Sequence, residues 1–168
     1  MSQMFFNEIE AVRIAQNMEK GGLAFYQAAA AKTASAPVRS LLLRLGEDEK
    51  RHLETFEKLE DTLQAGRRGQ PDAEEDPQLG AYIDRLLETQ VFAGEGSVAR
   101  LAREARDDAA AMAVGMKAER DSIVFYQEML DFVDSKVARD AFHWIVKEER
   151  RHLRELGDEA EKCGGRKA

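Results

Sequence analysis

The sequence has very little cysteine and very little proline. Its 168 residues include one cysteine, Cys163, and three prolines. One cysteine cannot form an internal disulfide or the paired Cys-x-x-Cys of a zinc ribbon or rubredoxin site, so we expect a reducing, cytoplasmic setting. The scarcity of proline and the lack of β-branched alternation predict an all-α chain.

Long apolar runs and an excess of positive charge are also missing. No window approaches the roughly 18 uninterrupted apolar residues of a membrane span, and residues 1–7 lack the basic and apolar regions of an export signal. We therefore expect no membrane partner. The formal net charge is −7, which argues against nucleic acid bound through a broad basic surface. The length suits one domain, 1–168, with a substantial core.

Apolar residues recur at three- and four-residue steps along most of the chain, which is typical of amphipathic helices. The pattern predicts two long helices within residues 7–65 and two more within 107–163. Between them it predicts a shorter helix from Pro77 to Phe92 and a short helical piece capped by Ser97. The remainder of this connection is polar and contains Pro and Gly, as loops do.

The two pairs of long helices form an internal repeat. Residues 11–57 align with 111–157 without a gap, at an offset of 100 residues. Repeated hairpins of this kind can bury their apolar faces against each other as a four-helix bundle. The connection 66–106 is then a long crossover containing a short helix. The identical pairs in the repeat include Glu19/Glu119, Tyr26/Tyr126, Glu49/Glu149 and His52/His152.

Each half places a Glu three residues before a His, and residues three apart share one face of a helix. The other helix of each half carries one more Glu on its apolar stripe. Burying four carboxylates costs several kcal/mol each unless cations neutralise them, and two divalent metals cancel four charges. We therefore predict six metal ligands: Glu19, Glu49, His52, Glu119, Glu149 and His152.

Other readings remain open for several residues. A metal-free scaffold would require all six predicted ligands to be solvated. Packing alone explains Tyr26 and Tyr126 as well as a hydrogen bond to a ligand carboxylate does. His143 lies nine residues before His152, about half a turn around the helix, so we expect it to face away from the metals.

The pattern Glu19, Glu49-x-x-His52, Glu119, Glu149-x-x-His152 resembles the di-iron carboxylate site of the ferritin-like superfamily. The repeat, the crossover helix and the Glu-x6-Tyr spacing are most similar to its rubrerythrin-like branch. The resemblance implies a ferritin-like bundle and two iron ions, for which Mn or Zn could substitute. It also implies roles for the ligands: Glu49 and Glu149 bridge the irons, Glu19 and Glu119 are terminal, and His52 and His152 serve one iron each.

The resemblance implies a function as well. We expect a di-iron oxidoreductase that reduces hydrogen peroxide or dioxygen, with Tyr26 and Tyr126 as candidate catalytic residues that orient the ligands. The alternative is a ferroxidase or iron-sequestering protein. Ser122 stands where rubrerythrins have an additional Glu, and the four cysteines of their rubredoxin domain are lacking. We therefore expect an external electron donor, such as a rubredoxin-like protein, and a homodimer.

Overall fold

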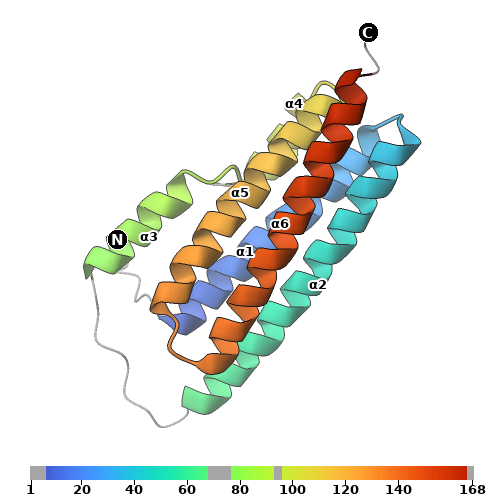
Figure 1. Ribbon diagram of the computed structural model, residues 1–168. Helices are drawn as coiled ribbons and strands as arrows, with labels where there is room; N and C mark the ends of the chain where they lie inside the picture. The colour runs from blue at the N-terminus through green and yellow to red at the C-terminus, as the bar shows by residue number, and fades with distance from the viewer. Residues whose placement is uncertain (1–6, 68–76, 93–95, 166–168) are drawn as a thin grey trace.

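The computed structural model describes residues 7–67, 77–92 and 96–165. These residues form helices and no strand, which confirms the predicted all-α class. Four helices are long and two are short (Figure 1). The helices are α1 (Glu8–Lys32), α2 (Ala36–Arg67), α3 (Pro77–Glu88), α4 (Ser97–Glu104), α5 (Asp108–Phe132) and α6 (Lys136–Gly165).

Side-chain caps begin the long helices at matching places in the two halves. Asn7 accepts two backbone N–H groups in the first turn of α1, and Asp107 accepts one at the start of α5. The hydroxyls of Ser35 and Ser135 accept the backbone N–H three residues on, at 3.5 and 3.3 Å, where α2 and α6 begin. Caps satisfy N–H groups that have no partner within the helix. Both hairpins therefore begin their helices in the same register.

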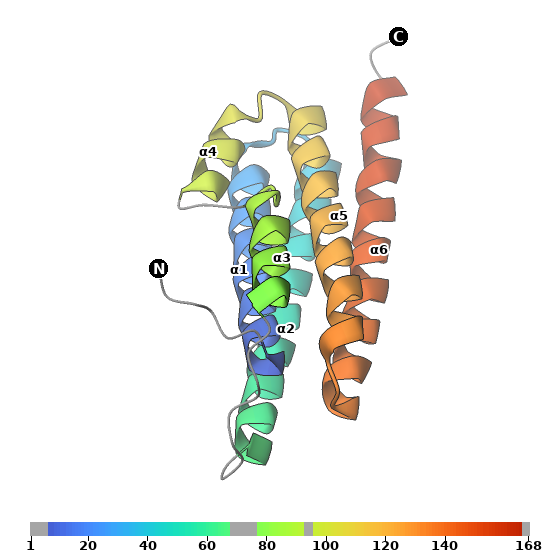
Figure 2. The ribbon, with the colours of Figure 1, turned by 90° about the vertical axis from the view of Figure 1, so that its left-hand side faces the viewer.

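The four long helices form an antiparallel bundle. Helix α1 packs against α2 and α5 against α6, and α2 also contacts α6. In Figure 1, α1 and α6 run one way along the bundle and α2 and α5 run the other. Figure 2 shows the short helices α3 and α4 over the side formed by α1 and α5. The ferritin-like bundle of two hairpins is therefore confirmed, and within the described residues the crossover covers its α1–α5 side.

Two apolar clusters fill the interior at different levels of the bundle. One includes Phe56, Phe125 and Phe142, and the other includes Phe25 and Leu42. Along every long helix, the predicted ligands lie between the residues of one cluster and those of the other. The polar side chains are therefore held at mid-length by apolar packing above and below.

The crossover differs from its predicted form in two details. Helix α3 ends at Glu88, so Phe92 is not part of it; the Phe92 ring instead packs against Phe25 of α1. Helix α4 is capped by Gly96 with a positive φ of 74°, and no side chain caps it, so the prediction of a Ser97 cap was wrong. Much of the predicted loop, residues 68–76, lies outside the described residues.

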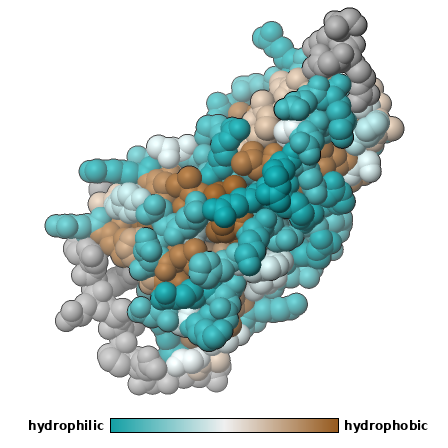
Figure 3. Space-filling view, viewed as in Figure 1, coloured by the Kyte–Doolittle hydropathy of each residue, from teal (hydrophilic) through white to brown (hydrophobic). Residues whose placement is uncertain are grey.

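On the face drawn in Figure 3, apolar surface forms a band along α5 and the adjoining part of α3, whereas the outward side of α6 is mostly hydrophilic. Val124 of α5 and Tyr82 of α3 are among the exposed large apolar residues. No helix in the described part of the chain is both long enough and apolar enough to span a bilayer.

Candidate metal centre

The four long helices bring all six predicted ligands into one buried cluster. Helices α1 and α5 contribute one Glu each, and α2 and α6 contribute a Glu and a His each. Each of the six residues is at most 4% exposed. Solvated side chains, which the metal-free alternative requires, are therefore not observed. Metal binding by these six residues stays a prediction.

The two central carboxylates each face both imidazoles. Glu149 places Oε1 3.2 Å from Nδ1 of His52 and Oε2 3.3 Å from Nδ1 of His152. Glu49 places Oε1 3.2 Å from Nδ1 of His152 and Oε2 3.9 Å from Nδ1 of His52. The two rings are stacked, with centroids 5.3 Å apart. A carboxylate with one oxygen toward each imidazole has the placement that a bridge between two metals requires.

The outer carboxylates each lie beside the imidazole of their own hairpin. Glu19 Oε2 is 3.3 Å from Nδ1 of His52, and Glu119 Oε1 is 3.6 Å from Nδ1 of His152. A carboxylate and an imidazole from the same half therefore stand together on each side of the central pair. This is the arrangement expected of one terminal Glu and one His for each of two metals.

The tyrosines join the two hairpins through hydrogen bonds. The hydroxyl of Tyr26 donates to Glu119, and that of Tyr126 donates to Glu19. Burial, followed by repulsion from the carboxylate that each one contacts, raises the pKa of both phenols well above the ordinary value. Both hydroxyls therefore keep their protons and act as donors. Their contacts favour the hydrogen-bonding interpretation over packing alone.

The carboxylates do not share one electrostatic environment. Burial, followed by repulsion between the two central carboxylates, raises the pKa of Glu49 well above its ordinary value; burial, followed by repulsion from Glu119, does the same for Glu149. For Glu19 and Glu119 burial acts in the same direction, but close contacts with the central carboxylates and the imidazoles outweigh it and lower the pKa. Burial acts to lower the pKa of His152, but contacts with the surrounding carboxylates raise it. Without a cation, the centre therefore has to hold protons.

Unpaired buried atoms test whether the cluster fits metal ions. Four of its atoms have no hydrogen-bond partner among the described residues: Glu49 Oε1, both carboxylate oxygens of Glu149 and Nδ1 of His152. Leaving such atoms unpaired is costly. One ligand atom from each of Glu49, His52, Glu149 and His152 lies within 4.8 Å of the others. Oxygen and imidazole ligands suit Fe, Mn and Zn, so the buried cluster could hold a metal pair.

Two more residues lie on the same helices as the cluster, His143 on α6 and Asp48 on α2. His143 is exposed, which agrees with the prediction that it faces away. Asp48 is 2% exposed and touches His152, although the sequence pattern does not single it out. The one available signal is that Asp48 differs from its repeat counterpart, Glu148, directly before the two central glutamates.

Comparisons with known proteins identify the family and the fold. The rubrerythrin family model matches residues 10–159. No curated protein matches the sequence. A DUF305 fragment from Deinococcus radiodurans is similar in fold, with a TM-score of 0.67 and 18% identity, over 92% of this chain and 95% of that one. A hypothetical protein from Pyrococcus furiosus gives a TM-score of 0.64 and 20% identity, over 93% and 89% of the two chains.

A longer protein provides a third likeness. A two-domain protein from Anabaena variabilis contains DJ-1/ThiJ/PfpI-like and ferritin-like domains; it matches with a TM-score of 0.60 and 16% identity, over 92% of this chain and 39% of that protein. Identities this low establish the fold alone. The family match, in contrast, covers most of the sequence, including both hairpins and all six clustered side chains. This chain belongs to the rubrerythrin family.

Proposed function

We propose that this chain is a di-iron oxidoreductase that reduces hydrogen peroxide or dioxygen with electrons from an external donor. One observation carries the proposal: Glu49 and Glu149 each direct their two oxygens toward both imidazoles inside a buried, four-carboxylate centre. Metals that share two carboxylates lie close enough to act together on one small oxidant. Membership of the rubrerythrin family supports the same function.

The chemistry divides between the metals and the protein. Two ferrous ions would each supply one electron, and with two protons these electrons reduce hydrogen peroxide to two waters. Glu19 and Glu119 complete the ligand set, and Tyr126 and Tyr26 hold their orientation through hydrogen bonds from the opposite hairpin. Burial keeps bulk water away, which strengthens every electrostatic interaction in the centre.

The reaction also requires a source of electrons. The sequence contains a single cysteine, so it cannot build a four-cysteine iron site of the rubredoxin type. We propose that a one-electron donor protein of the rubredoxin class reduces the centre between turnovers.

The test begins with metal content. After anaerobic loading with ferrous iron and removal of the excess, we expect two irons per chain, and peroxide consumption when reduced rubredoxin is added. His52→Ala should lose iron and turnover, whereas His143→Ala, which changes the exposed histidine, should keep both. Many irons per chain with little peroxide turnover would instead identify an iron-sequestering protein. A wild-type chain that retains no iron would contradict both functions.

A further inference from the structure

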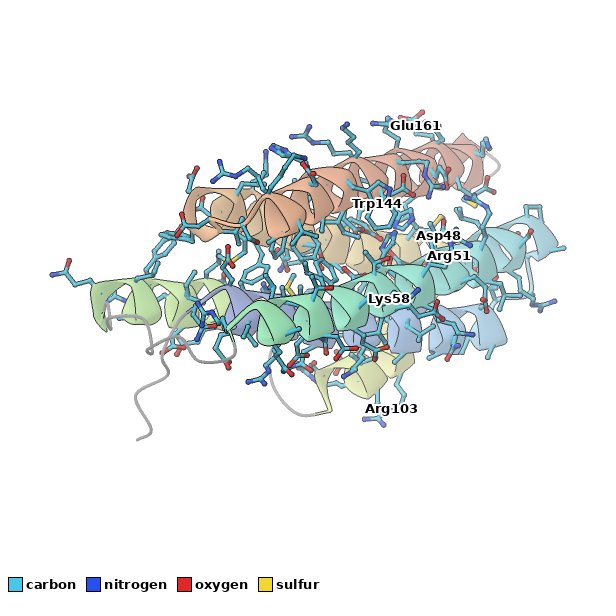
Figure 4. All side chains as sticks on the ribbon, turned by 90° about the horizontal axis from the view of Figure 1, so that it is seen from below. Asp48, Arg51, Lys58, Arg103, Trp144 and Glu161 are labelled. Carbon is cyan, nitrogen blue, oxygen red and sulfur yellow. The ribbon has the colours of Figure 1, made fainter. Side chains whose placement is uncertain are left out.

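The repeat breaks its symmetry next to the cluster. The residue before the central Glu is Asp48 in the first half and Glu148 in the second. Asp48 Oδ2 lies 3.3 Å from Nε2 of His152, and Figure 4 shows Asp48 between α2 and α6. Glu148 makes no reciprocal contact; its Oε2 accepts Nη2–H of Arg151 on its own helix at 2.6 Å. Among the described residues, only the imidazole of His152 therefore has a carboxylate at its Nε2.

The contact with Asp48 selects one tautomer of His152. Nδ1 of this ring faces the central carboxylates, so it must be free of a proton to bind a metal. The proton of the neutral ring is then on Nε2, from which it donates to Asp48. Arg151 Nη2 is 3.5 Å from the same nitrogen, but it already donates to Glu148 and Asp48. Such a carboxylate fixes the ring orientation and makes the inner nitrogen a stronger ligand.

The other imidazole has a different neighbour. The ring of His52 meets Trp144 edge-on, with centroids 5.4 Å apart and planes at 88°. Within the described residues, no carboxylate approaches Nε2 of His52 to the distance of an ion pair. Trp144 is 39% exposed and lies between α2 and α6 in Figure 4. An indole shields the ring but offers no charged acceptor to a histidine N–H.

We propose that the two metal positions are inequivalent, and that Asp48 is the residue that makes the position of Glu119 and His152 the tighter one. This inference rests on the proposed metal centre. Asp48 touches neither metal nor oxidant; it is a positioning residue that acts through His152. The position of Glu19 and His52 lacks this support, so it should fill second and lose its ion first.

A metal titration tests the order of binding. Anaerobic addition of Co²⁺ to the apo protein, followed by visible absorption and calorimetry, should resolve two steps in the wild type. His152→Ala should remove the tighter step. Asp48→Ala should weaken that step by about tenfold or more, the range seen when a partner of a ligating histidine is lost. Glu148→Ala removes only a partly exposed ion pair, so both steps should stay within about twofold of the wild type.

A second measurement separates positioning from a structural role, because Asp48 also has two ion pairs. One is with Arg51 on its own helix, and the other is with Arg151 and links α2 to α6. In ¹⁵N-histidine spectra of the apo protein, we expect one slowly exchanging Nε2–H, from His152. Asp48→Ala should lose this signal. Arg151→Ala, which removes the partner of Asp48 on α6, should keep both the signal and the tighter step. Asp48→Asn, which retains an acceptor oxygen, should give an intermediate affinity.

The outcomes separate this inference from the proposed function. A wild-type protein that binds no Co²⁺ would overturn the metal centre and the inference with it. Two bound Co²⁺ with equal effects of Asp48→Ala and Glu148→Ala would overturn only the inequivalence. Loss of the tighter step in Arg151→Ala as well would assign the effect to the packing of α2 against α6 rather than to His152, and would also overturn the inequivalence.

Discussion

The two hairpins supply the same predicted ligands but surround them differently. Each provides a terminal Glu, a central Glu, a His and a Tyr at identical repeat positions. Their neighbours have diverged: Asp48 stands opposite Glu148 in the alignment, and Gly22 stands opposite Ser122. The shared side chains are the set that a pair of metals requires. The differences between the neighbouring residues should set the metal affinity of each position.

The shared set also shows that neither hairpin has a complete centre. Tyr26 donates across the bundle to Glu119, and Tyr126 donates back to Glu19. The central carboxylate of each half reaches the imidazole of the other. Formation of the centre therefore requires that the halves pack together, and any equivalence between them can be tested by paired substitutions.

The largest effect should come from removing a central carboxylate. Glu49 faces both imidazoles, so Glu49→Ala should lower the metal content from two ions per chain to nearly none. Elemental analysis of loaded protein measures this. Glu149→Ala should give the same result, because its carboxylate spans the centre in the same way.

The control for this pair is Glu47→Ala, which changes an exposed Glu on the same helix and should keep both metals. Retention of two metals by either central variant would count against a bridging role. If one of the two central variants loses both metals and the other keeps one, then the two halves are unequal even in the residues they share.

The second largest effect should be the dependence of the apo protein's folding stability on pH. The folded-state pKa values of Glu49, Glu149 and His152 are raised above their unfolded values. Between about pH 5 and pH 8 the folded state therefore binds more protons, so its stability falls as pH rises, by up to about 1.4 kcal/mol per pH unit for each extra proton. The lowered pKa values of Glu19 and Glu119 change the stability only at pH values below this window.

Thermal unfolding between pH 5 and pH 8 checks the sign. The Tm of the apo protein should fall across the window, while that of metal-loaded protein should change little, because the ions replace the protons. Glu49→Gln and Glu149→Gln should each flatten the apo slope, and by similar amounts if the two halves are electrostatically equal. A Tm that rises with pH in the apo protein would contradict the assigned shifts.

Much of this structure could be predicted from the sequence, because the signals involved are periodic. Helical spacing and the ungapped repeat indicated the all-α bundle, and Glu-x-x-His at the same place in both halves indicated which side chains meet. The partners of Tyr26 and Tyr126 were anticipated only as carboxylates from neighbouring helices, since crossing bonds depend on how the hairpins pack.

What the sequence did not reveal depends on contacts between helices. Asp48 sits in a run of charged residues and looks like part of a solvated face; only the packing of α2 against α6 buries it beside His152. The end of α3 was placed too late, because the apolar residues Val91 and Phe92 continue the helical pattern. Phe92 instead leaves the helix and packs its ring on Phe25 of α1.

A smaller effect should come from the crossing hydrogen bonds. Tyr26→Phe and Tyr126→Phe each remove a donor to a buried carboxylate, which typically costs about 1.5–3 kcal/mol. Denaturant unfolding of loaded protein should show similar losses for the two variants. Tyr82→Phe is the matched control. Because Tyr82 is 43% exposed, this variant should change the free energy of unfolding by no more than about 0.5 kcal/mol. Unequal losses for the two buried tyrosines would extend the asymmetry to the terminal carboxylates.

The smallest effect tests the second difference between the halves. A Cβ added at Gly22 would lie 3.0 Å from Oε2 and 3.1 Å from Cδ of Glu49. Gly22→Ala gains about 1 kcal/mol of helix propensity but overpacks the site at a cost of about 1–3 kcal/mol. The free energy of unfolding of loaded protein should therefore fall by about 1 kcal/mol, and metal should bind more weakly.

Two variants are controls for this prediction. Ser122→Ala should change the stability little, because the second half already carries a Cβ there. At Gly66 an added Cβ would meet no atom of the described residues within 4 Å, so Gly66→Ala should be neutral or slightly stabilising. If Gly22→Ala instead raises the Tm and keeps the metal affinity, then Glu49 has room to shift, and the glycine is not needed to seat the bridge.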